Sequence, residues 1–177
     1  MTHADPSAPG AGSPARADAR RNRARVLGAA RCAFGAVGLD AGHHEIARRA
    51  GVGVGTVYRH FPDRAALLEA VLLDVLGGLQ EGAERALADA DAWGAFAGFF
   101  ATLAGAMRAH AGLSEQLDQR GGPRVAEARE RLVETIRGLC EAARAGGPRA
   151  DVGWRDVVFL AGAAGSRACS LDVGGEA

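Results

Sequence analysis

Apolar side chains recur at helical spacing along most of the chain. Between about Asp18 and Gly38 they come every three or four residues with arginines on the opposite side, which predicts an amphipathic first helix that ends at Gly38. Two shorter periodic stretches follow, at 43–50 and 54–61, separated only by residues 51–53, which include two glycines. Two short helices joined by such a turn are typical of a helix-turn-helix.

Longer apolar helices follow this unit. Pro62 ends it, and Asp63 is a suitable N-cap for a long fourth helix. A fifth helix is predicted from Trp93 onwards, and a seventh between two Gly-Gly-Pro breaks at 121–123 and 146–148. The short sixth helix is marked by Leu113 and Leu117. The last helix, at about 151–169, is apolar on every side over 157–165, so we expect a second subunit to cover it.

The predicted fold class is all-α, with an N-terminal three-helix helix-turn-helix domain and a C-terminal helical domain. Residues 1–17 are rich in Ala, Pro, Gly and Ser without apolar periodicity, which predicts a disordered arm. We assign residues 18–62 to the helix-turn-helix domain and 63–177 to a helical domain for effector binding and dimerisation.

Charge is distributed unevenly although the net charge is zero. All 21 basic residues are arginines, and nine of them lie in residues 16–61 against three acidic residues. Residues 62–177 hold twelve arginines against seventeen acidic residues. A basic head on an acidic body indicates that only the head meets a polyanion, the alternative being a solvated basic helix face.

Several other classes are disfavoured. The three cysteines, Cys32, Cys140 and Cys169, form no C-x-x-C pair, which disfavours a disulfide scaffold or a zinc knuckle. Residues 43–45, His-His-Glu, lack the i, i+4 spacing of helical metal ligands, so no metal site is predicted. No nucleophile elbow or phosphate loop is present, so we expect neither an enzyme nor a cofactor. Without a signal core or a run of roughly 20 apolar residues, the chain is predicted to be reduced, cytoplasmic and not membrane-bound.

Residues 45–73, EIARRAGVGVGTVYRHFPDRAALLEAVLL, resemble the N-terminal DNA-binding domain of the TetR family of transcriptional regulators. The resemblance rests on I-A-x-x-A-G-V followed three residues on by G-T-x-Y-x-x-F, and it extends back through residues 25–39. It implies a sequence-specific regulator, usually a repressor that a small-molecule effector releases from a palindromic double-stranded operator. It also implies a homodimer.

The second short helix is then the recognition helix, whose N-terminal residues meet base edges in the major groove. With Val57 and Phe61 buried, we expect Arg59 to read a guanine. The resemblance implies phosphate or base contacts for Thr56, Tyr58 and His60. The DNA-binding residues predicted in full are His44, Arg48, Val54, Gly55, Thr56, Tyr58, Arg59, His60 and Arg64. Alternatives stay open: Tyr58 as a half-buried core residue, Thr56 as a local cap, and Arg48 and Arg49 as a solvated pair.

The sequence departs from the family pattern at the helix starts. Gly42 and Gly53 stand where many members have Ser or Thr, and Val54 stands where Lys is common. Fewer phosphate contacts are expected, for which the arginines at 20, 21, 23 and 25 can compensate. These departures leave open a helical interaction module that has lost specific DNA binding, and the cysteines leave open a redox-sensing regulator.

The C-terminal half is expected to enclose a mostly apolar effector. Its predicted pocket residues, for which ordinary core is the alternative, are Trp93, Phe96, Phe100, Leu103, Met107, Ile136 and Cys140. Polar groups within reach are few, among them His110, Gln116 and Gln119. Only SLDVGGEA follows the last helix, where family members generally have another helix in the dimer bundle. Either one helix per subunit forms the interface, or the reading frame is short.

Overall fold

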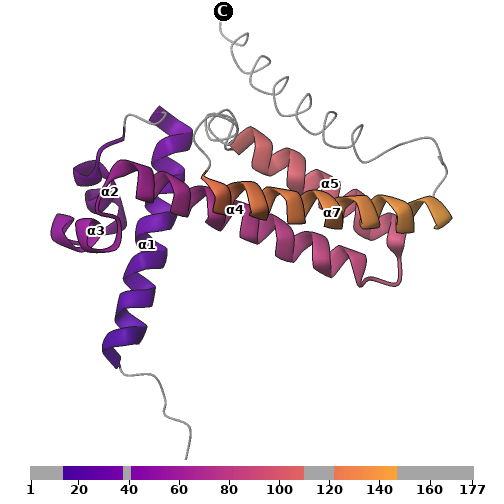
Figure 1. Cartoon of the computed structure of the whole chain (residues 1–177), viewed down its shortest axis with the longest axis horizontal. Helices are drawn as coiled ribbons and strands as arrows, with labels where there is room; N and C mark the ends of the chain where they lie inside the picture. The colour runs from indigo at the N-terminus through magenta and orange to yellow at the C-terminus, as the bar shows by residue number, and fades with distance from the viewer. Residues whose placement is uncertain (1–13, 38–40, 110–121, 147–177) are drawn as a thin grey trace, which may run out of the picture.

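The computed structural model describes residues 14–37, 41–109 and 122–146, which form six helices and no strand. Figure 1 shows α2 and α3 packed against α1 at one end of the molecule, with α4 running from this head into a body formed with α5 and α7. The predicted all-α fold is confirmed. The helices are α1 (Pro14–Val37), α2 (His43–Ala50), α3 (Val54–His60), α4 (Arg64–Leu87), α5 (Ala92–Ala109) and α7 (Pro123–Gly146). The predicted sixth and last helices lie outside the described residues.

Helix α1 begins earlier than the sequence predicts. It starts at Pro14 rather than at about Asp18, so residues 14–17, predicted to belong to a disordered arm, are helical. A proline fits the first turn of a helix because the N–H that it lacks has no intrahelical acceptor there. The alanines and arginines that follow are good helix formers. Residues 1–13 of the predicted arm lie outside the described residues.

The turn between α2 and α3 depends on one glycine. Gly51 adopts φ 62° and ψ 39°, the left-handed region that glycine enters without steric cost. Its amide donates to the Arg48 carbonyl at 3.2 Å, and the Val52 amide donates to the Ala47 carbonyl at 3.1 Å. These two bonds form a Schellman motif, which satisfies the last carbonyls of α2 and reverses the chain.

The N-terminus of α4 has the predicted cap. The Asp63 carboxylate accepts a hydrogen bond from the Ala66 amide at 2.8 Å. A carboxylate here also interacts favourably with the positive end of the helix dipole. The predicted start of the fourth helix is therefore confirmed.

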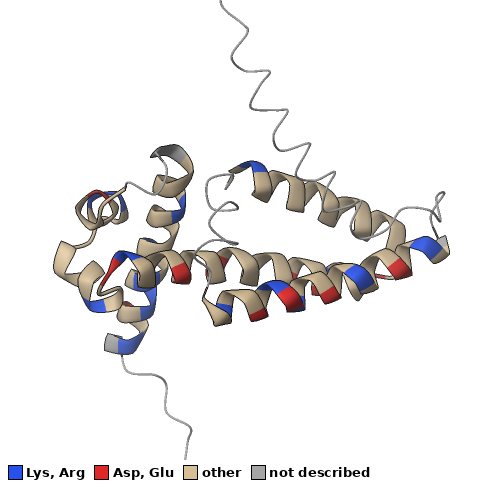
Figure 2. Cartoon of the chain, turned by 45° about the horizontal axis from the view of Figure 1, so that its top comes forward, with Lys and Arg blue, Asp and Glu red and all other residues tan. Residues whose placement is uncertain are grey.

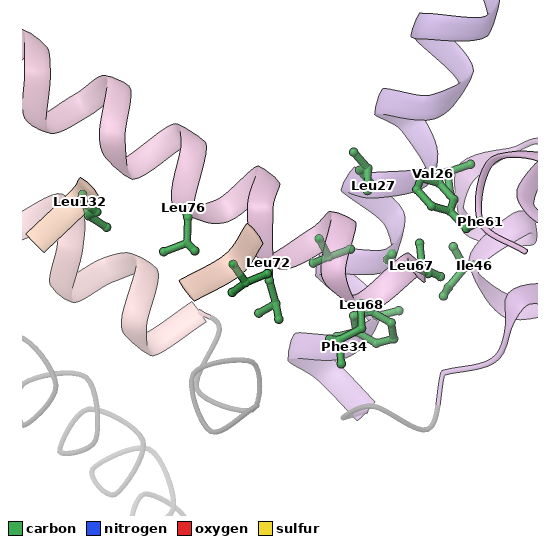
Figure 3. Close-up of a cluster of buried hydrophobic side chains, with 14 of the residues drawn as sticks. Val26, Leu27, Phe34, Ile46, Phe61, Leu67, Leu68, Leu72, Leu76 and Leu132 are labelled. Atoms are coloured by element: carbon green, nitrogen blue, oxygen red, sulfur yellow. The ribbon is translucent and has the colours of Figure 1, made fainter. Parts of the chain in front are cut away.

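One continuous core joins head and body (Figure 3). In the head, α1 contributes Val26 and Phe34, and α4 contributes Leu67, all at most 1% exposed. Further along α4, buried Leu72 and Leu76 belong to the same cluster. The body adds buried residues of α5 and α7, namely Phe99, Leu103, Val125, Leu132, Ile136, Leu139 and Cys140. The core thus crosses the predicted domain boundary at residues 62/63 without a break.

Close contacts outside this core also tie the head to the body. Arg31 of α1 pairs with Asp74 of α4 at 3.1 Å. A Cβ at Gly35 would lie 2.8 Å from the Ala109 carbonyl oxygen, so the last turn of α5 approaches α1 through a position that only glycine fits well. In the ranges that the structure describes, no helix combines the length and apolarity needed to span a bilayer.

The Phe34 side chain tests this shared core. We expect Phe34→Ala to lower the free energy of unfolding by about 3–5 kcal/mol, because it removes a fully buried ring between α1 and its neighbours. Urea unfolding followed by circular dichroism measures the loss. The matched control is Cys32→Ala on the exposed side of the same helix, for which the change should stay below about 0.5 kcal/mol. Equal effects of the two variants would contradict the assigned core.

Candidate nucleic-acid interface

Helix α3 has one face in the core and another in solvent. Val57 is fully buried and Phe61, which follows the helix, is 2% exposed, as the sequence predicts. Tyr58 is 46% exposed, and Arg59 is exposed next to it. The head therefore exposes the polar face of a short helix whose opposite face is buried in the core.

Tyr58 is held in place by a residue of the preceding helix. Its ring stacks on the His43 imidazole, with centroids 4.6 Å apart and planes 2° apart. The His43 Nε2 lies 3.3 Å from the Phe61 carbonyl oxygen, where an imidazole N–H donates a hydrogen bond. The stack orients Tyr58, which is 46% exposed and belongs neither to the core cluster nor to the residues packed against it. The sequence prediction missed His43, because nothing in the spacing shows that the two rings meet.

Thr56, Arg59 and Gly55 lie on the accessible part of α3. The Arg59 Nη2 donates to the Thr56 Oγ1 at 3.3 Å, one turn away on the same helix. Thr56 does not cap α3 with its side chain, since the N-cap is Gly53 and no side chain bonds there. A Cβ at Gly55 would meet nothing within 4 Å, so a partner can approach the backbone closely.

Three of the predicted contact residues are partly buried, namely Val54, Thr56 and His60. Val54 packs against the core. The His60 ring is tilted against Phe61 at a centroid distance of 6.2 Å. His44, at the start of α2, and Arg64, at the start of α4, are exposed as predicted.

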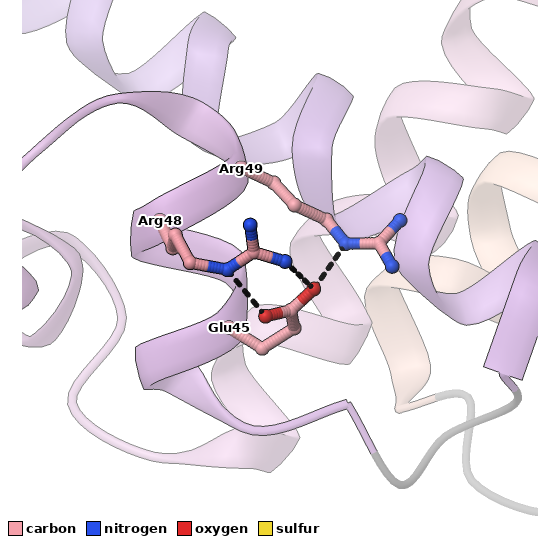
Figure 4. Close-up of polar contacts among 3 residues, drawn as sticks. All are labelled: Glu45, Arg48 and Arg49. Atoms are coloured by element: carbon pink, nitrogen blue, oxygen red, sulfur yellow. Dashed lines mark hydrogen bonds and ion pairs between the residues drawn. The ribbon is translucent and has the colours of Figure 1, made fainter.

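Glu45 binds both arginines of α2 (Figure 4). Arg48 donates through Nε and Nη2 to the two carboxylate oxygens at 2.9 and 2.7 Å, and the Arg49 Nε donates to Oε1 at 2.6 Å. The two hydrogen bonds from Arg48, and then the one from Arg49, lower the pKa of Glu45 from 4.5 to about 2. Arg48 and Arg49 are therefore not simply solvated, and a phosphate that binds them competes with a carboxylate.

Two arginines of α1 contact residues of the helix-turn-helix within the head. The Arg25 Nη2 donates to the Gly51 carbonyl at 3.1 Å, which fastens α1 to the turn between α2 and α3. The Arg23 guanidinium lies 5.4 Å from the centroid of the Phe61 ring, within cation–π range. The sequence prediction placed both arginines along DNA, and in the structure both also hold the helix-turn-helix against α1.

The predicted pocket residues gather on the α5–α7 side of the body. Leu103, Ile136 and Cys140 are buried in the core cluster, and three further residues are partly buried against it, namely Phe96, Phe100 and Met107. Trp93 is 40% exposed and stacks on Phe96 at 5.6 Å. The polar candidates His110, Gln116 and Gln119 lie outside the described residues. Within the described ranges no group of three or more His, Cys, Asp or Glu side chains is placed to hold a metal ion.

Similarity to known proteins agrees with this geometry. Residues 26–71 match the family of bacterial regulatory proteins named tetR. A TetR transcription regulatory protein from Mycobacterium vanbaalenii is 39% identical, with 90% of this chain and 96% of that one covered and a TM-score of 0.71. A TetR transcriptional regulator from Streptomyces coelicolor is 30% identical, with coverages of 86% and 97% and a TM-score of 0.65.

A third solved structure shares the fold alone. The transcriptional regulator FadR from Bacillus subtilis, solved in complex with stearoyl-CoA, is 16% identical to this chain over 86% of its length and 89% of that one, with a TM-score of 0.62. No curated protein is significantly similar to the chain.

Gly51 provides a test of the turn. We expect Gly51→Ala to lower the free energy of unfolding by about 1–2 kcal/mol, because alanine is strained at φ 62°. Its Cβ would also lie 2.7 Å from the Arg25 Nη2. Gly78→Ala is the control, since a Cβ there meets nothing within 4 Å and alanine favours the interior of α4. Urea unfolding should show a loss for the first variant and a gain of about 0.5–1 kcal/mol for the second.

The carboxylate of Glu45 provides a second test. Because its pKa is lowered in the folded state, the pairing stabilises the fold above pH 4.5 and is lost as the pH falls towards about 2. We expect an NMR titration of the Glu45 side chain to show a midpoint near pH 2. The same titration in Arg48→Ala/Arg49→Ala should return the midpoint towards 4.5. An unchanged midpoint in that variant would show that the arginines are not the cause.

Proposed function

Because the chain belongs to the TetR family of transcriptional regulators, we propose that it is a repressor that binds a palindromic operator as a homodimer and leaves it when a small molecule binds the body. The stacked and exposed Tyr58 beside Arg59 is the observation that carries the proposal. The Tyr58 ring and the Arg59 guanidinium are both exposed on α3, where they can contact DNA. In a DNA groove, phosphate contacts position the protein and base contacts give specificity.

In this proposal α3 enters the major groove and α2 crosses the backbone. Gly55, Thr56 and Arg59 face base edges, and Tyr58 bonds a phosphate through its hydroxyl. His44 and Arg64 contact phosphates at the starts of their helices, with Arg48 beside them. Two-fold symmetry would place two copies of α3 about one DNA turn, roughly 34–36 Å, apart on a palindrome in the cytoplasm.

The helix caps favour a second candidate function. Neither Gly42 nor Gly53 offers a side-chain hydrogen bond at its helix start, and Val54 is partly buried. The head thus has fewer phosphate-binding groups than the family pattern implies. If the chain binds no operator, the remaining candidate is a helical interaction module that has lost specific DNA binding.

A redox switch is less well supported. Burial raises the pKa of the Cys140 thiol, which disfavours the reactive thiolate. Cys32 is exposed on α1 and unpaired. Cys169, the third cysteine, lies outside the described residues.

We propose a mostly apolar effector that binds along the aromatic side of α5. Trp93 and Phe96 are stacked and partly accessible, and Phe100 and Met107 continue the same side towards the head. A ligand that spreads these side chains would push on α4 and thereby on the head, since α4 packs against α1, α5 and α7. Only a difference in ligand affinity between the two conformations is needed to release DNA.

Operator binding tests the proposed recognition residue. We expect Arg59→Ala to weaken binding to a duplex from the region upstream of this gene by about 1–3 kcal/mol, roughly 5- to 150-fold, with much less change for a random-sequence duplex. Fluorescence anisotropy at fixed salt measures both affinities. Arg85→Ala, which removes an exposed arginine at the far end of α4, is the control and should leave both unchanged. Equal losses on the two duplexes would show that Arg59 contacts phosphate rather than a base.

A substitution at Tyr58 separates the contribution of its aromatic ring to DNA binding from that of its hydroxyl. Tyr58→Phe keeps the stack on His43 and removes only the hydroxyl, so we expect a loss of severalfold on both duplexes, as for one phosphate contact. Circular dichroism should be unchanged. Wild-type affinity in Tyr58→Phe would exclude the hydroxyl from the interface.

Trp93 reports on the proposed effector site. In Trp154→Phe it is the sole tryptophan, since the chain has two. We use stearoyl-CoA as the first probe because FadR was solved with it. We expect saturable change in Trp93 emission together with loss of operator binding, and weaker binding of the probe to Phe100→Ala. A change in emission without DNA release would contradict the coupling between body and head.

A further inference from the structure

The N-terminal half of α1 projects from the head and buries no side chain between residues 16 and 25 (Figure 1). In this stretch only Ala17 and Asn22 are even partly covered. Buried residues of α1 begin at Val26. A helix that is polar all round gains little from tertiary packing, so this segment calls for another explanation.

Its charge is strongly positive. Five arginines lie between residues 16 and 25 against one acidic residue, Asp18 (Figure 2). Three of them have partners: Arg21 pairs with Asp18 on the same segment, while Arg23 contacts the Phe61 ring and Arg25 the Gly51 carbonyl in the head. The two outermost, Arg16 and Arg20, are exposed and have no partner among the described residues. They are four residues apart and so share one face of α1.

The position of this segment relative to α3 indicates what it meets. Arg25 bonds the turn directly before α3, whose N-terminal end is the part that enters a groove. The segment continues outwards from this point for 12 residues, from Pro14 to Arg25, or about 18 Å of helix. That length corresponds to about five base pairs at 3.4 Å each.

We infer that the exposed face of α1 carrying Arg16 and Arg20 binds the phosphate backbone of the DNA that flanks the site read by α3. The inference rests on the proposed DNA binding. The partner is double-stranded DNA because the face is basic, lies beside the recognition helix and presents guanidinium groups suited to phosphate. The internal pairs of Arg23 and Arg25 fix the direction of the helix, so that the outer arginines are held towards the flank.

Salt dependence on a random-sequence duplex tests the inference. Contacts to phosphate carry no sequence information, so the operator need not be known. We expect Arg16→Ala/Arg20→Ala to make the slope of log affinity against log salt less negative by about 1.8, which is 0.9 for each lost contact. Over a fourfold rise in salt, the affinity of the wild-type chain then falls about twelvefold more than that of the variant.

Matched variants exclude other causes. Arg85→Ala/Arg131→Ala removes two exposed arginines from the body and should leave the slope unchanged. Arg16→Lys/Arg20→Lys keeps both charges and should restore the wild-type slope. Alanine and lysine are both good helix formers, so neither change is expected to melt α1. A slope unaffected by Arg16→Ala/Arg20→Ala, shifted equally by the body variant or not restored by lysine overturns the inference.

Duplex length gives an independent readout. The full chain should bind a duplex extended by about six base pairs on each side more tightly than one trimmed to the α3 site, and Arg16→Ala/Arg20→Ala should abolish this gain. If the wild-type chain prefers its operator but shows no gain from flanks, the inference fails and the proposed function stands. If the gain is present on random DNA but no operator is preferred, the proposed repressor fails and the flank contact stands.

Discussion

The structure depends on the apolar face of α4, which contributes to the shared core in both the head and the body. Its first turns bury Leu67, Leu68 and Val71 beneath α1, and its later turns bury Leu76 and Ala83 beside α5 and α7. Because these residues lie on one helix, the displacement that a bound effector is proposed to cause in the body would reach the head through α4. Close-packed interiors pass displacement on rather than absorbing it. The proposed coupling between effector binding and DNA release needs such a connection, and α4 packs against helices of both the head and the body.

Polar and aromatic contacts in the head also hold α3 in position. His43 positions Tyr58, Arg25 holds the turn at Gly51, and Arg23 covers the Phe61 ring. His43 joins α2 to α3, and the two arginines join α1 to residues before and after α3. Individually each is worth little at an exposed surface, but together they limit how α3 can tilt relative to α1. A preorganised α3 loses less conformational entropy when it binds.

Part of the positive charge of the head is neutralised by an acidic side chain. Glu45 binds Arg48 and Arg49, so α2 contributes less free positive charge than its sequence suggests. Within the described part of the head, arginines without an acidic partner lie instead at the outer end of α1, namely Arg16 and Arg20, and on α3, namely Arg59. Figure 2 shows the remaining charges of both signs mixed along α7, which fits a surface that does not attract DNA. The helix spacing of Glu45, three and four residues before the arginines, is a local signal from which this pairing could have been predicted.

The sequence alone determined the six helices that the structure describes, the turn at Gly51-Val52-Gly53, the cap at Asp63 and the burial of Val57 and Phe61. Each of these depends on spacing or on the conformational preference of nearby residues. The sequence placed the start of α1 too late, since the local composition resembles a disordered arm while a proline can begin a helix. Only the tertiary structure decided which side chains meet: His43 with Tyr58 and Arg25 with the turn. Such contacts join residues far apart in the chain, and their geometry is set by how the buried faces pack.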